Sequence, residues 1–465
     1  MINKKRPFFY EKKKTSLKKK FLTTIIIIVI VVVFLLQIPR IRQIIITPIY
    51  SMGSFLWNGA KDLFQMSRMY PEEEKPRQTC TPLELPDRQV LFAESLENLS
   101  AVSREDPLAD LRQTPTPSEY SLVAQWEYLD PNLNYAITYG EQPPSEEKHI
   151  QLIPPVFEHA DLFNDGAAIL SANLRYWGIV ENQYNIAAII HPDSLDPSIS
   201  FAEMEDYVSK EYSDYQTIRR LNGDSETIIN VLQKKIPVLI MMSNKTPFSF
   251  WPMDDHIEAS YIMLLGYDGQ AQTFFYQDTK NGNTLEISES DLLSAWYPFQ
   301  REYMIVYPKN NDSEIREALS ENYFEELNLQ KALTKFRTDS ELLPDNPYAQ
   351  YNCGVILHRD GDNGGAWELF QKAEISGLPQ RYFIYQSDML QTALELGYAD
   401  DLETSVDLVL LRNAHDEVLT TYKGWVYILR GDIKKGSEYF EKAKNINQNN
   451  QTVQYALKYK DTMLN

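Results

Sequence analysis

Eighteen consecutive uncharged residues, FLTTIIIIVIVVVFLLQI at 21–38, constrain this chain more than any other stretch of its sequence. A helix rises about 1.5 Å per residue, so this run spans roughly 27 Å, close to the hydrocarbon core of a bilayer. Lipid offers no partners for backbone hydrogen bonds, and a helix makes all of them internally. We therefore expect residues 21–38 to form a single transmembrane helix.

The charges that flank this run predict its orientation. Residues 1–20 contain nine Lys or Arg and one Glu, whereas only Arg40 and Arg42 follow the run closely. The positive-inside bias places the basic segment 1–20 in the cytoplasm and the bulk of the chain outside the plasma membrane. A cleaved signal peptide is the alternative, but the run is long and no small-residue cleavage pattern follows it, which favours an uncleaved anchor.

Residues 39–150 are predicted to be a juxtamembrane segment followed by a spacer. The apolar stretch IIITPIYSMGSFLW lies either in the membrane interface or in a packed juxtamembrane helix, and the sequence does not separate the two. Prolines and acidic residues dominate from residue 70 onward, as in YPEEEKPRQTCTPLELP and EQPPSEEKH. This composition is typical of a spacer, with a short helix expected around VLFAESLENLSAV.

Charge and cysteine content exclude two classes of protein. The formal net charge is −20, and a nucleic-acid-binding protein normally presents a basic face to phosphates. The two cysteines, Cys80 and Cys353, lie in a Pro-rich stretch and in a helical pattern, respectively. This is not the cysteine pattern of a disulfide-stabilised scaffold.

Residues 151–308 are predicted to form an α+β domain. Helical spacing of apolar residues begins in GAAILSANLRYW and ends at Gly178, and a capping box starts a later helix at Ser200 with Glu203. IAAIIHP ends one further helix, and ETIINVLQKK forms another. The pattern then changes to short apolar or alternating runs typical of strands, namely IPVLIMMS, HIEASYIMLLGYD, TFFYQDTK and REYMIVYP. Helices followed by antiparallel strands indicate the α+β class.

This order, with these residues, resembles the papain-like cysteine peptidases that trim bacteriocin leaders (family C thirty-nine), and in particular their membrane-tethered bacterial relatives. The family begins its first helix at Asn-x-Cys-Gly-Pro, and the matching stretch here, FNDGA at 163–167, has Asp165 in place of the cysteine. The strand HIEASYIMLLGYD supplies His256, and TFFYQDTKNG supplies Asp278. The resemblance thus implies a triad at Asp165, His256 and Asp278 that has lost its thiol.

The substitution at Asp165 bears on catalysis more than on the fold. The family's thiolate attacks a carbonyl, its imidazole acts as the base and its aspartate orients the imidazole. A carboxylate is a poor nucleophile toward amides, and Asp is a favoured N-cap residue that preserves a helix start. Ala167 also replaces the family's proline, and the expected oxyanion amide is absent at His159 and Ala160. We therefore expect no peptidase turnover.

Two other chemistries remain open at these positions. An unrecognised nucleophile would make the domain an active peptidase or transferase. One imidazole and two carboxylates could also hold a divalent metal, although Asp–His pairs are far more often structural, so no metal and no cofactor is predicted. The loop HPDSLDP at 191–197 is expected to be a solvated rim, and PFSFWPMDDH at 247–256 either lines a peptide groove or simply packs.

Residues 313–465 contain an internal repeat. Ala332 and Ala366 lie 34 residues apart, as do Phe336 and Phe370. Two segments, 351–373 and 422–443, share glycine, phenylalanine and alanine at matching places (Gly354, Gly361, Phe370 and Ala373; Gly424, Gly431, Phe440 and Ala443). This period and this order of small and large residues predict tetratricopeptide repeats, an all-α solenoid.

The repeat pattern makes two further predictions. Gly361 and Gly431 should end the first helices of their pairs in a left-handed conformation. A degenerate unit between them keeps Gly397, and the Cys-Gly at 353–354 belongs to a repeat helix rather than to a catalytic site.

Together these patterns predict a membrane-anchored extracytoplasmic protein with a peptidase-like domain at 151–308 and a repeat array at 313–465. Stacked helix pairs form concave surfaces, so the array is expected to bind a protein or peptide, or merely to buttress the neighbouring domain. The domain at 151–308 could also bind a peptide, in the cleft where the peptidases it resembles hold their substrate. The lipid bilayer is a partner of the anchor, and nucleic acid is not a partner.

Overall fold

The computed structural model describes residues 80–83, 85, 149–245, 257–282 and 284–463, all of which belong to one compact unit. The predicted transmembrane run 21–38 and the helix expected near 90–102 lie outside these residues. Within the described part of the chain, no helix is both long enough and apolar enough to cross a membrane.

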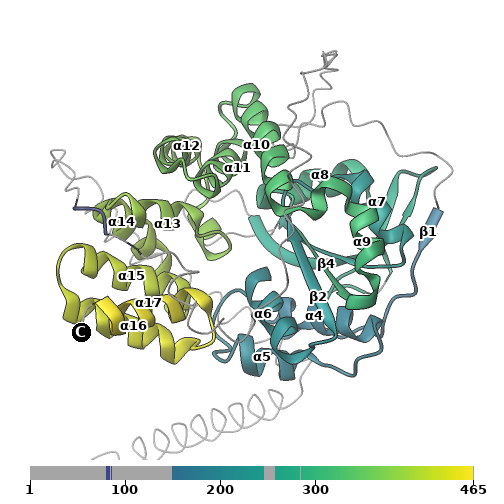
Figure 1. Ribbon diagram of the computed structural model, residues 1–465, viewed down its shortest axis with the longest axis horizontal. Coiled ribbons are helices and arrows are strands. Elements are labelled where there is room, and N and C mark those ends of the chain that lie inside the picture. Colours follow the sequence, from purple (N-terminus) through teal and green to yellow (C-terminus); the bar gives the residue numbers. More distant parts are fainter. Residues whose placement is uncertain (1–79, 84, 86–148, 246–256, 283, 464–465) are drawn as a thin grey trace, which may run out of the picture. The chain divides into compact units, whose positions relative to one another are not determined.

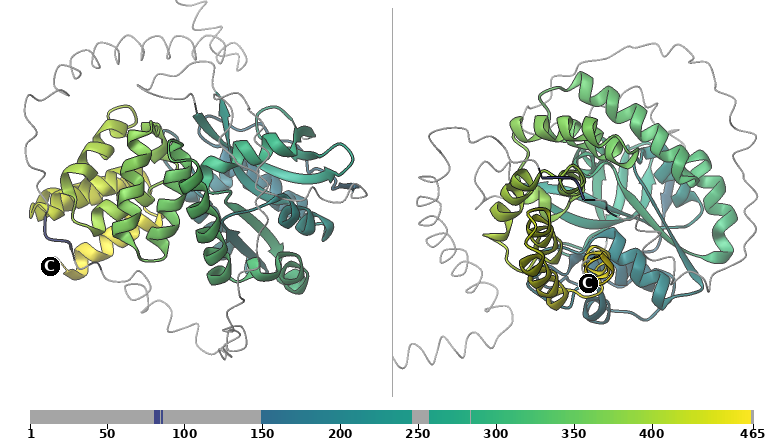
Figure 2. Two further views of the ribbon diagram at one scale, coloured as in Figure 1. Left: turned by 90° about the horizontal axis from the view of Figure 1, so that it is seen from above. Right: turned by 60° about the vertical axis from the view of Figure 1, so that its left-hand side comes forward.

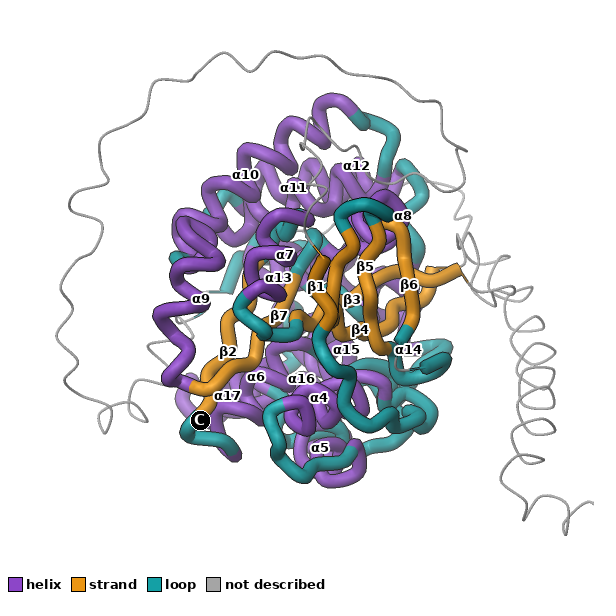
Figure 3. The backbone as a smooth tube through the Cα atoms, turned by 90° about the vertical axis from the view of Figure 1, so that its right-hand side faces the viewer, coloured by secondary structure: helices purple, strands orange, loops and turns teal. Residues whose placement is uncertain are grey.

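An antiparallel sheet of seven strands forms the centre of the first half of the described chain (Figures 1 and 3). The strand order is β2-β7-β3-β4-β5-β6, and β1 pairs with the end of β4 beyond the reach of β3. The strands are β1 (His149–Gln151), β2 (Tyr215–Arg220), β3 (Val238–Lys245), β4 (Ile257–Asp268), β5 (Thr273–Gln277), β6 (Leu285–Ser288) and β7 (Tyr303–Pro308). Strand β4 therefore contacts three other strands.

Among the described residues, six helices accompany the sheet, and four of them pack directly on its strands: α4 on β4, α6 on β2, α7 on β4 and β3, and α8 on β3. Their apolar faces and the sheet share one core that includes Leu170, Met204 and Ile240. The helices are α4 (Asp165–Tyr176), α5 (Gln183–Ile190), α6 (Phe201–Glu211), α7 (Ser225–Gln233), α8 (Glu289–Trp296) and α9 (Asp312–Leu319).

The α+β class predicted for this half of the chain is confirmed. The four predicted strands correspond to β3, β4, β5 and β7, and the capping box of Ser200 and Glu203 starts α6 as expected. Strands β1, β2 and β6 were not predicted. They are three to six residues long, and β2 (YQTIRR) has only one buried side chain, so it lacks the apolar alternation that identifies a strand.

Eight helices follow in succession from α10 to α17, drawn in green and yellow in Figure 2. Consecutive helices pack against each other along the series. Their bounds are α10 (Glu325–Leu342), α11 (Pro347–Arg359), α12 (Asn363–Ile375), α13 (Asp388–Glu395), α14 (Ala399–Leu410), α15 (Glu417–Leu429), α16 (Ile433–Ile446) and α17 (Gln451–Met463). The described residues from 313 onward thus form helices joined by turns and loops, with no strand among them.

Two of the turn glycines behave as predicted. Gly361 follows α11 with φ +90°, and Gly431 follows α15 with φ +81°. L-residues with a side chain rarely adopt this conformation, whereas glycine does so without steric cost. The prediction that these glycines end the first helix of their pairs is confirmed. Cys353 lies buried inside α11, as expected for a helix residue.

The sheet domain and the helical series are joined by buried polar contacts as well as by apolar packing. Tyr297 Oη donates to Asp339 Oδ2 at 3.0 Å, and Asn352 Nδ2 donates to the backbone oxygen of Tyr297 at 2.8 Å. Gln300 Nε2 donates to Asn352 Oδ1 at 2.8 Å. The ring of Phe299 stacks on Tyr382 with centroids 5.9 Å apart. These contacts fix α10 and α11 against the turn that follows α8.

Candidate functional site

Helix α4 begins at Asp165 and points its first turn toward strand β4. Asp165 Oδ2 accepts a hydrogen bond from the backbone N–H of Tyr261 in β4, at a length of 3.4 Å. The preceding residue Asn164 is the N-cap and makes no side-chain capping bond, and Phe163 before it has φ +60°. The prediction that Asp165 starts the helix is confirmed, but its assignment as the N-cap is wrong, because the helical conformation begins one residue earlier than expected.

The environment of Asp165 favours its neutral form. Burial raises the pKa of this carboxyl, and the nearby charge of Lys280 and the Tyr261 N–H only partly oppose that effect. Lys280 comes from the turn after β5 and pairs with Glu258 of β4 at 3.5 Å. In either protonation state, this carboxyl is a poor nucleophile toward amides.

Asp278 lies at the end of β5, where its carboxylate closes a tight turn. Oδ1 accepts from the backbone N–H groups of Lys280, Asn281 and Gly282 at 3.1, 2.7 and 3.0 Å. Oδ2 accepts from Asn281 Nδ2 at 2.6 Å. Three donors saturate Oδ1, and Oδ2 keeps room for one further donor. Most of the hydrogen-bonding capacity of Asp278 therefore serves its own turn.

His256, the third member of the predicted triad, lies outside the described residues, immediately before β4. The structure brings Asp165 to β4 and places Asp278 at the end of the neighbouring strand β5, but the relation of either carboxyl to the imidazole stays a prediction. Among the described residues, no group of three or more His, Cys, Asp or Glu side chains is arranged to hold a metal ion.

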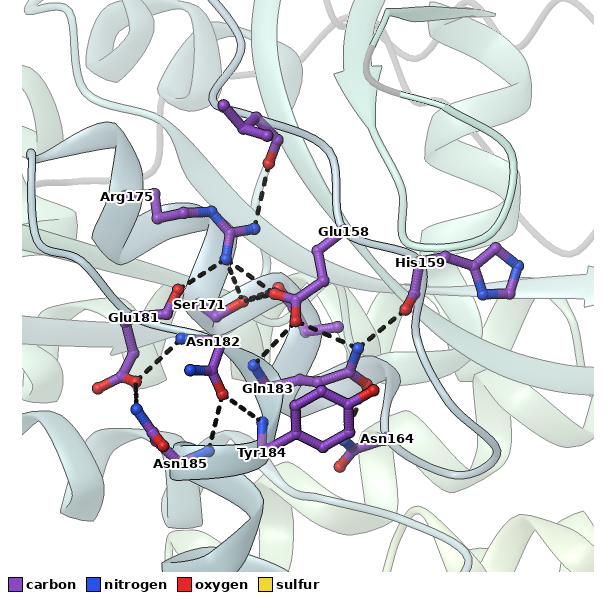
Figure 4. A network of polar contacts seen from close by, with 12 residues as sticks. Glu158, His159, Asn164, Ser171, Arg175, Glu181, Asn182, Gln183, Tyr184 and Asn185 are labelled. Carbon is purple, nitrogen blue, oxygen red and sulfur yellow. Dashed lines mark hydrogen bonds and ion pairs between the residues drawn. The ribbon is translucent and has the colours of Figure 1, made fainter. Parts of the chain in front are cut away.

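A connected set of polar side chains surrounds the segment that leads into α4 (Figure 4). Glu158 Oε2 accepts from Arg175 Nη1 and from Ser171 Oγ, both at 2.8 Å. Arg175 also donates to the backbone oxygens of Glu181 at 2.8 Å and Val156 at 3.1 Å. We call Glu158, Ser171, Arg175, Glu181 and Gln183 the Arg175 network. It ties the chain before α4 to α4 itself and to the start of α5.

The sequence patterns did not identify Gln183, whose side-chain amide holds the loop before α4. Its Nε2 donates to the backbone oxygen of His159 at 2.9 Å, and its Oε1 accepts from Asp161 N and Asn164 Nδ2, both at 2.9 Å. The amide is buried and braces the loop before the helix. Because Gln183 follows Asp165 by 18 residues, no local pattern could assign it to this loop.

Both carboxylates of the Arg175 network are stabilised in their charged forms. Burial alone would raise the pKa of Glu158, but hydrogen bonds from Arg175 and Ser171 outweigh it and lower the pKa. Burial would also raise the pKa of Glu181. Its hydrogen-bond donors outweigh that effect and lower the pKa, namely Tyr212, Asn182, Asn185 and Tyr207. Tyr212 Oη donates to Glu181 Oε2 at 2.6 Å.

A second polar cluster joins the loop after α5 to helix α15. Asp196, Glu203, Asp416 and Glu417 are all buried, and we call these four carboxyl groups the acidic junction. Glu203 Oε1 and Glu417 Oε1 both accept from Asn450 Nδ2, at 3.1 and 2.9 Å. The expectation that the loop at 191–197 is a solvated rim is wrong at Asp196, because the helical series covers it.

The carboxyl groups of the acidic junction favour their protonated forms. Burial, with a smaller effect from Glu417, raises the pKa of Asp196 well above its usual value. Burial raises the pKa of Asp416 to about 7 and that of Glu417 to about 8, and it also raises the pKa of Glu203. Asp416 is the N-cap of α15 and accepts from Leu419 N at 2.7 Å.

Comparisons with known proteins add a distant likeness. No family model and no curated protein matches this chain. Among solved structures, one crystal structure is described provisionally as a C39-like peptidase from Bacillus anthracis. It shares 13% sequence identity and covers 35% of this chain and 99% of its own, with a TM-score of 0.28. A likeness at this score carries no argument about catalysis.

Proposed function

We propose that this chain is a membrane-anchored extracytoplasmic protein that binds a peptide or protein and does not hydrolyse it. The observation that carries the proposal is the carboxyl of Asp165 at the start of α4, against β4, where the peptidases it resembles carry a thiol. Burial raises the pKa of this carboxyl, and a carboxyl is a poor nucleophile toward amides, so the helix start lacks the reacting thiol of those peptidases. Fold alone does not confer activity when the reacting group is missing.

Binding is assigned chiefly to the helical series, which we infer to be tetratricopeptide repeats. Two helix pairs support this inference with the same close contact. A Cβ on Gly354 in α11 would lie 2.7 Å from the ring of Phe370 in α12, and a Cβ on Gly424 in α15 would lie 2.6 Å from the ring of Phe440 in α16. Repeating the same small-against-large contact is what a stacked repeat requires.

The test of lost catalysis is to restore the thiol and an amide together. Asp165→Cys with His159→Gln supplies both, and His159 is preferable to Ala160, whose side chain is buried. We expect the wild-type chain and the control Asp165→Asn to leave peptide substrates intact, and the double variant to cleave them. Wild-type cleavage that His256→Ala abolishes would overturn the proposal.

The topology is tested separately. Because the basic segment 1–20 precedes the apolar run 21–38, we expect a protease added to intact protoplasts to remove the C-terminal mass. Protection of that mass until the membrane is opened would reverse the proposed orientation. Neither outcome depends on the chemistry of Asp165.

A further inference from the structure

Residues 80–83 and 85, from the predicted spacer, lie against the helical series. The backbone N–H of Cys80 donates to the backbone oxygen of Gly397 at 3.1 Å. Cys80, Leu83 and Leu85 are partly buried and pack against the hydrophobic core. This segment lies more than 300 residues before Gly397 in sequence, so the contact is a long-range docking rather than a local turn.

Gly397 is required at this contact for two reasons. It ends α13 with φ +75°, and a Cβ at this position would lie 2.6 Å from the backbone oxygen of Cys80 and 3.1 Å from the nitrogen of Pro82. Gly361 and Gly431 occupy the corresponding turns after α11 and α15, also with positive φ, but a Cβ there would meet nothing within 4 Å. Among the residues that the structure describes, the turn at Gly397 is the only one of these three with another segment seated on it.

The docked segment has the chemistry of a linear recognition motif. Pro82 restricts the residue before it to extended conformations, and a proline at position 86 does the same for Leu85. An extended peptide that contains proline loses little conformational entropy on binding. A backbone hydrogen bond to the turn and apolar contacts from the two leucines then supply affinity together with specificity.

We propose that the turn between α13 and α14 is a binding site for an extended Pro-Leu peptide, which residues 80–83 and 85 of the same chain occupy. A second protein with a segment of this kind binds there only by displacing the spacer. The inference rests on the proposed peptide-binding role of the helical series, and it names the place and the ligand class. The spacer thereby acts as a latch that competes with an external partner.

The two cysteines provide a built-in assay in the full-length protein. Cys80 belongs to the latch, whereas Cys353 is buried in α11 and reports unfolding. We expect Gly397→Ala to increase the rate of thiol modification at Cys80 by about tenfold, the factor for losing a hydrogen bond and apolar contacts. Gly431→Ala is the matched control, because it places Ala at a similar positive φ with no segment nearby. It should leave the rate at Cys80 within about twofold of the wild-type rate.

A second variant and a competing peptide make the test independent of the glycine. Leu83→Ser with Leu85→Ser should speed modification of Cys80 without changing that of Cys353. A synthetic peptide of residues 79–87 with Cys80→Ser, added in excess to the wild-type chain, should speed it as well. Unchanged modification of Cys80 in Gly397→Ala and in the leucine variant, or with the peptide, would overturn the inference.

The outcome is distinguishable from a failure of the proposed function. If the peptide displaces the latch while the wild-type chain cleaves peptides and His256→Ala abolishes that cleavage, the docking site stands and the non-catalytic role falls. If the peptide has no effect while the helical series binds some other protein, the docking site falls and the binding role stands.

Discussion

The Arg175 network and the acidic junction both bury carboxyl groups, yet they shift the pKa of those groups in opposite directions. Glu158 and Glu181 have lowered pKa values, whereas Asp416 and Glu417 have pKa values raised to about 7 and about 8. Burial acts in the same direction on all four. The difference comes from the partners, because burial raises a carboxyl pKa unless charges and donors stabilise the anion.

The partners differ in kind. Glu158 receives a guanidinium and a hydroxyl, and Glu181 receives two tyrosine hydroxyls, an amide and a backbone N–H. In the acidic junction the amide of Asn450 is shared between Glu203 and Glu417, and a second carboxyl, that of Asp196, hydrogen-bonds Glu417. Two carboxyl groups in contact need a proton between them. The junction thus holds the helical series to the sheet domain best when it is protonated.

The largest loss of stability should follow removal of the Arg175 guanidinium. Arg175→Met keeps the length of the side chain but leaves Glu158 without its charge partner, which is 2.8 Å away. Removing one member of a largely buried pair leaves an uncompensated charge, and we expect a loss of roughly 3 kcal/mol in the free energy of unfolding. Denaturant titration at pH 7 measures it. Lys210→Met is the control, because Lys210 is exposed, and it should cost less than about 0.5 kcal/mol. Equal losses in the two variants would contradict the contrast.

Sequence patterns predicted the parts of this molecule that depend on neighbours in the chain. The helix start at Asp165, the capping box of Ser200 and the helix-ending glycines all follow from residues a few positions apart. Each has a local physical cause, such as a side-chain oxygen that caps free N–H groups or a φ that only glycine tolerates.

The features that sequence patterns missed depend on residues far apart in the chain. Gln183 braces a loop 22 residues before it, and Asn447 donates to Glu203 across 244 positions. The loop at 191–197 has the composition of an exposed turn, yet Asp196 is buried and hydrogen-bonds Glu417 of α15. A pKa is set by such partners, so the contrast between the two clusters could not be read from composition or periodicity.

An intermediate effect is expected in the pH dependence of the wild-type chain. The folded state holds protons at the acidic junction that the unfolded chain releases above about pH 4.5, so stability falls as the pH rises from about 5 to about 8. Glu158 and Glu181 have lowered pKa values, so their contribution is lost instead as the pH falls below about 4.5. Stability should therefore be greatest near about pH 5 and decline by on the order of 2 kcal/mol by pH 8.

Calorimetry or denaturant titration across this range measures that profile. The net charge of −20 also disfavours the folded state at high pH through repulsion between surface groups. Salt at about 1 M screens exposed charges over roughly 3 Å but acts little on buried ones. A decline that disappears in 1 M salt would assign the pH dependence to the surface rather than to the acidic junction.

The smallest effect isolates one carboxyl of the junction. Glu417→Gln replaces a group that favours its protonated form with a neutral isostere, and its side-chain oxygen can still accept from Asn450. At pH 8 the substitution removes the cost of deprotonating Glu417, so we expect about 1 kcal/mol of added stability, and close to none at pH 5, where the wild-type group is already neutral. Glu181→Gln is the matched control with the opposite sign, because it removes an anion that four donors stabilise, and it should destabilise at pH 7. If Glu417→Gln destabilised the chain equally at pH 5 and pH 8, the glutamate would act through its shape and hydrogen bonds alone. The opposite pKa shifts of the Arg175 network and the acidic junction would then have no effect on how stability depends on pH.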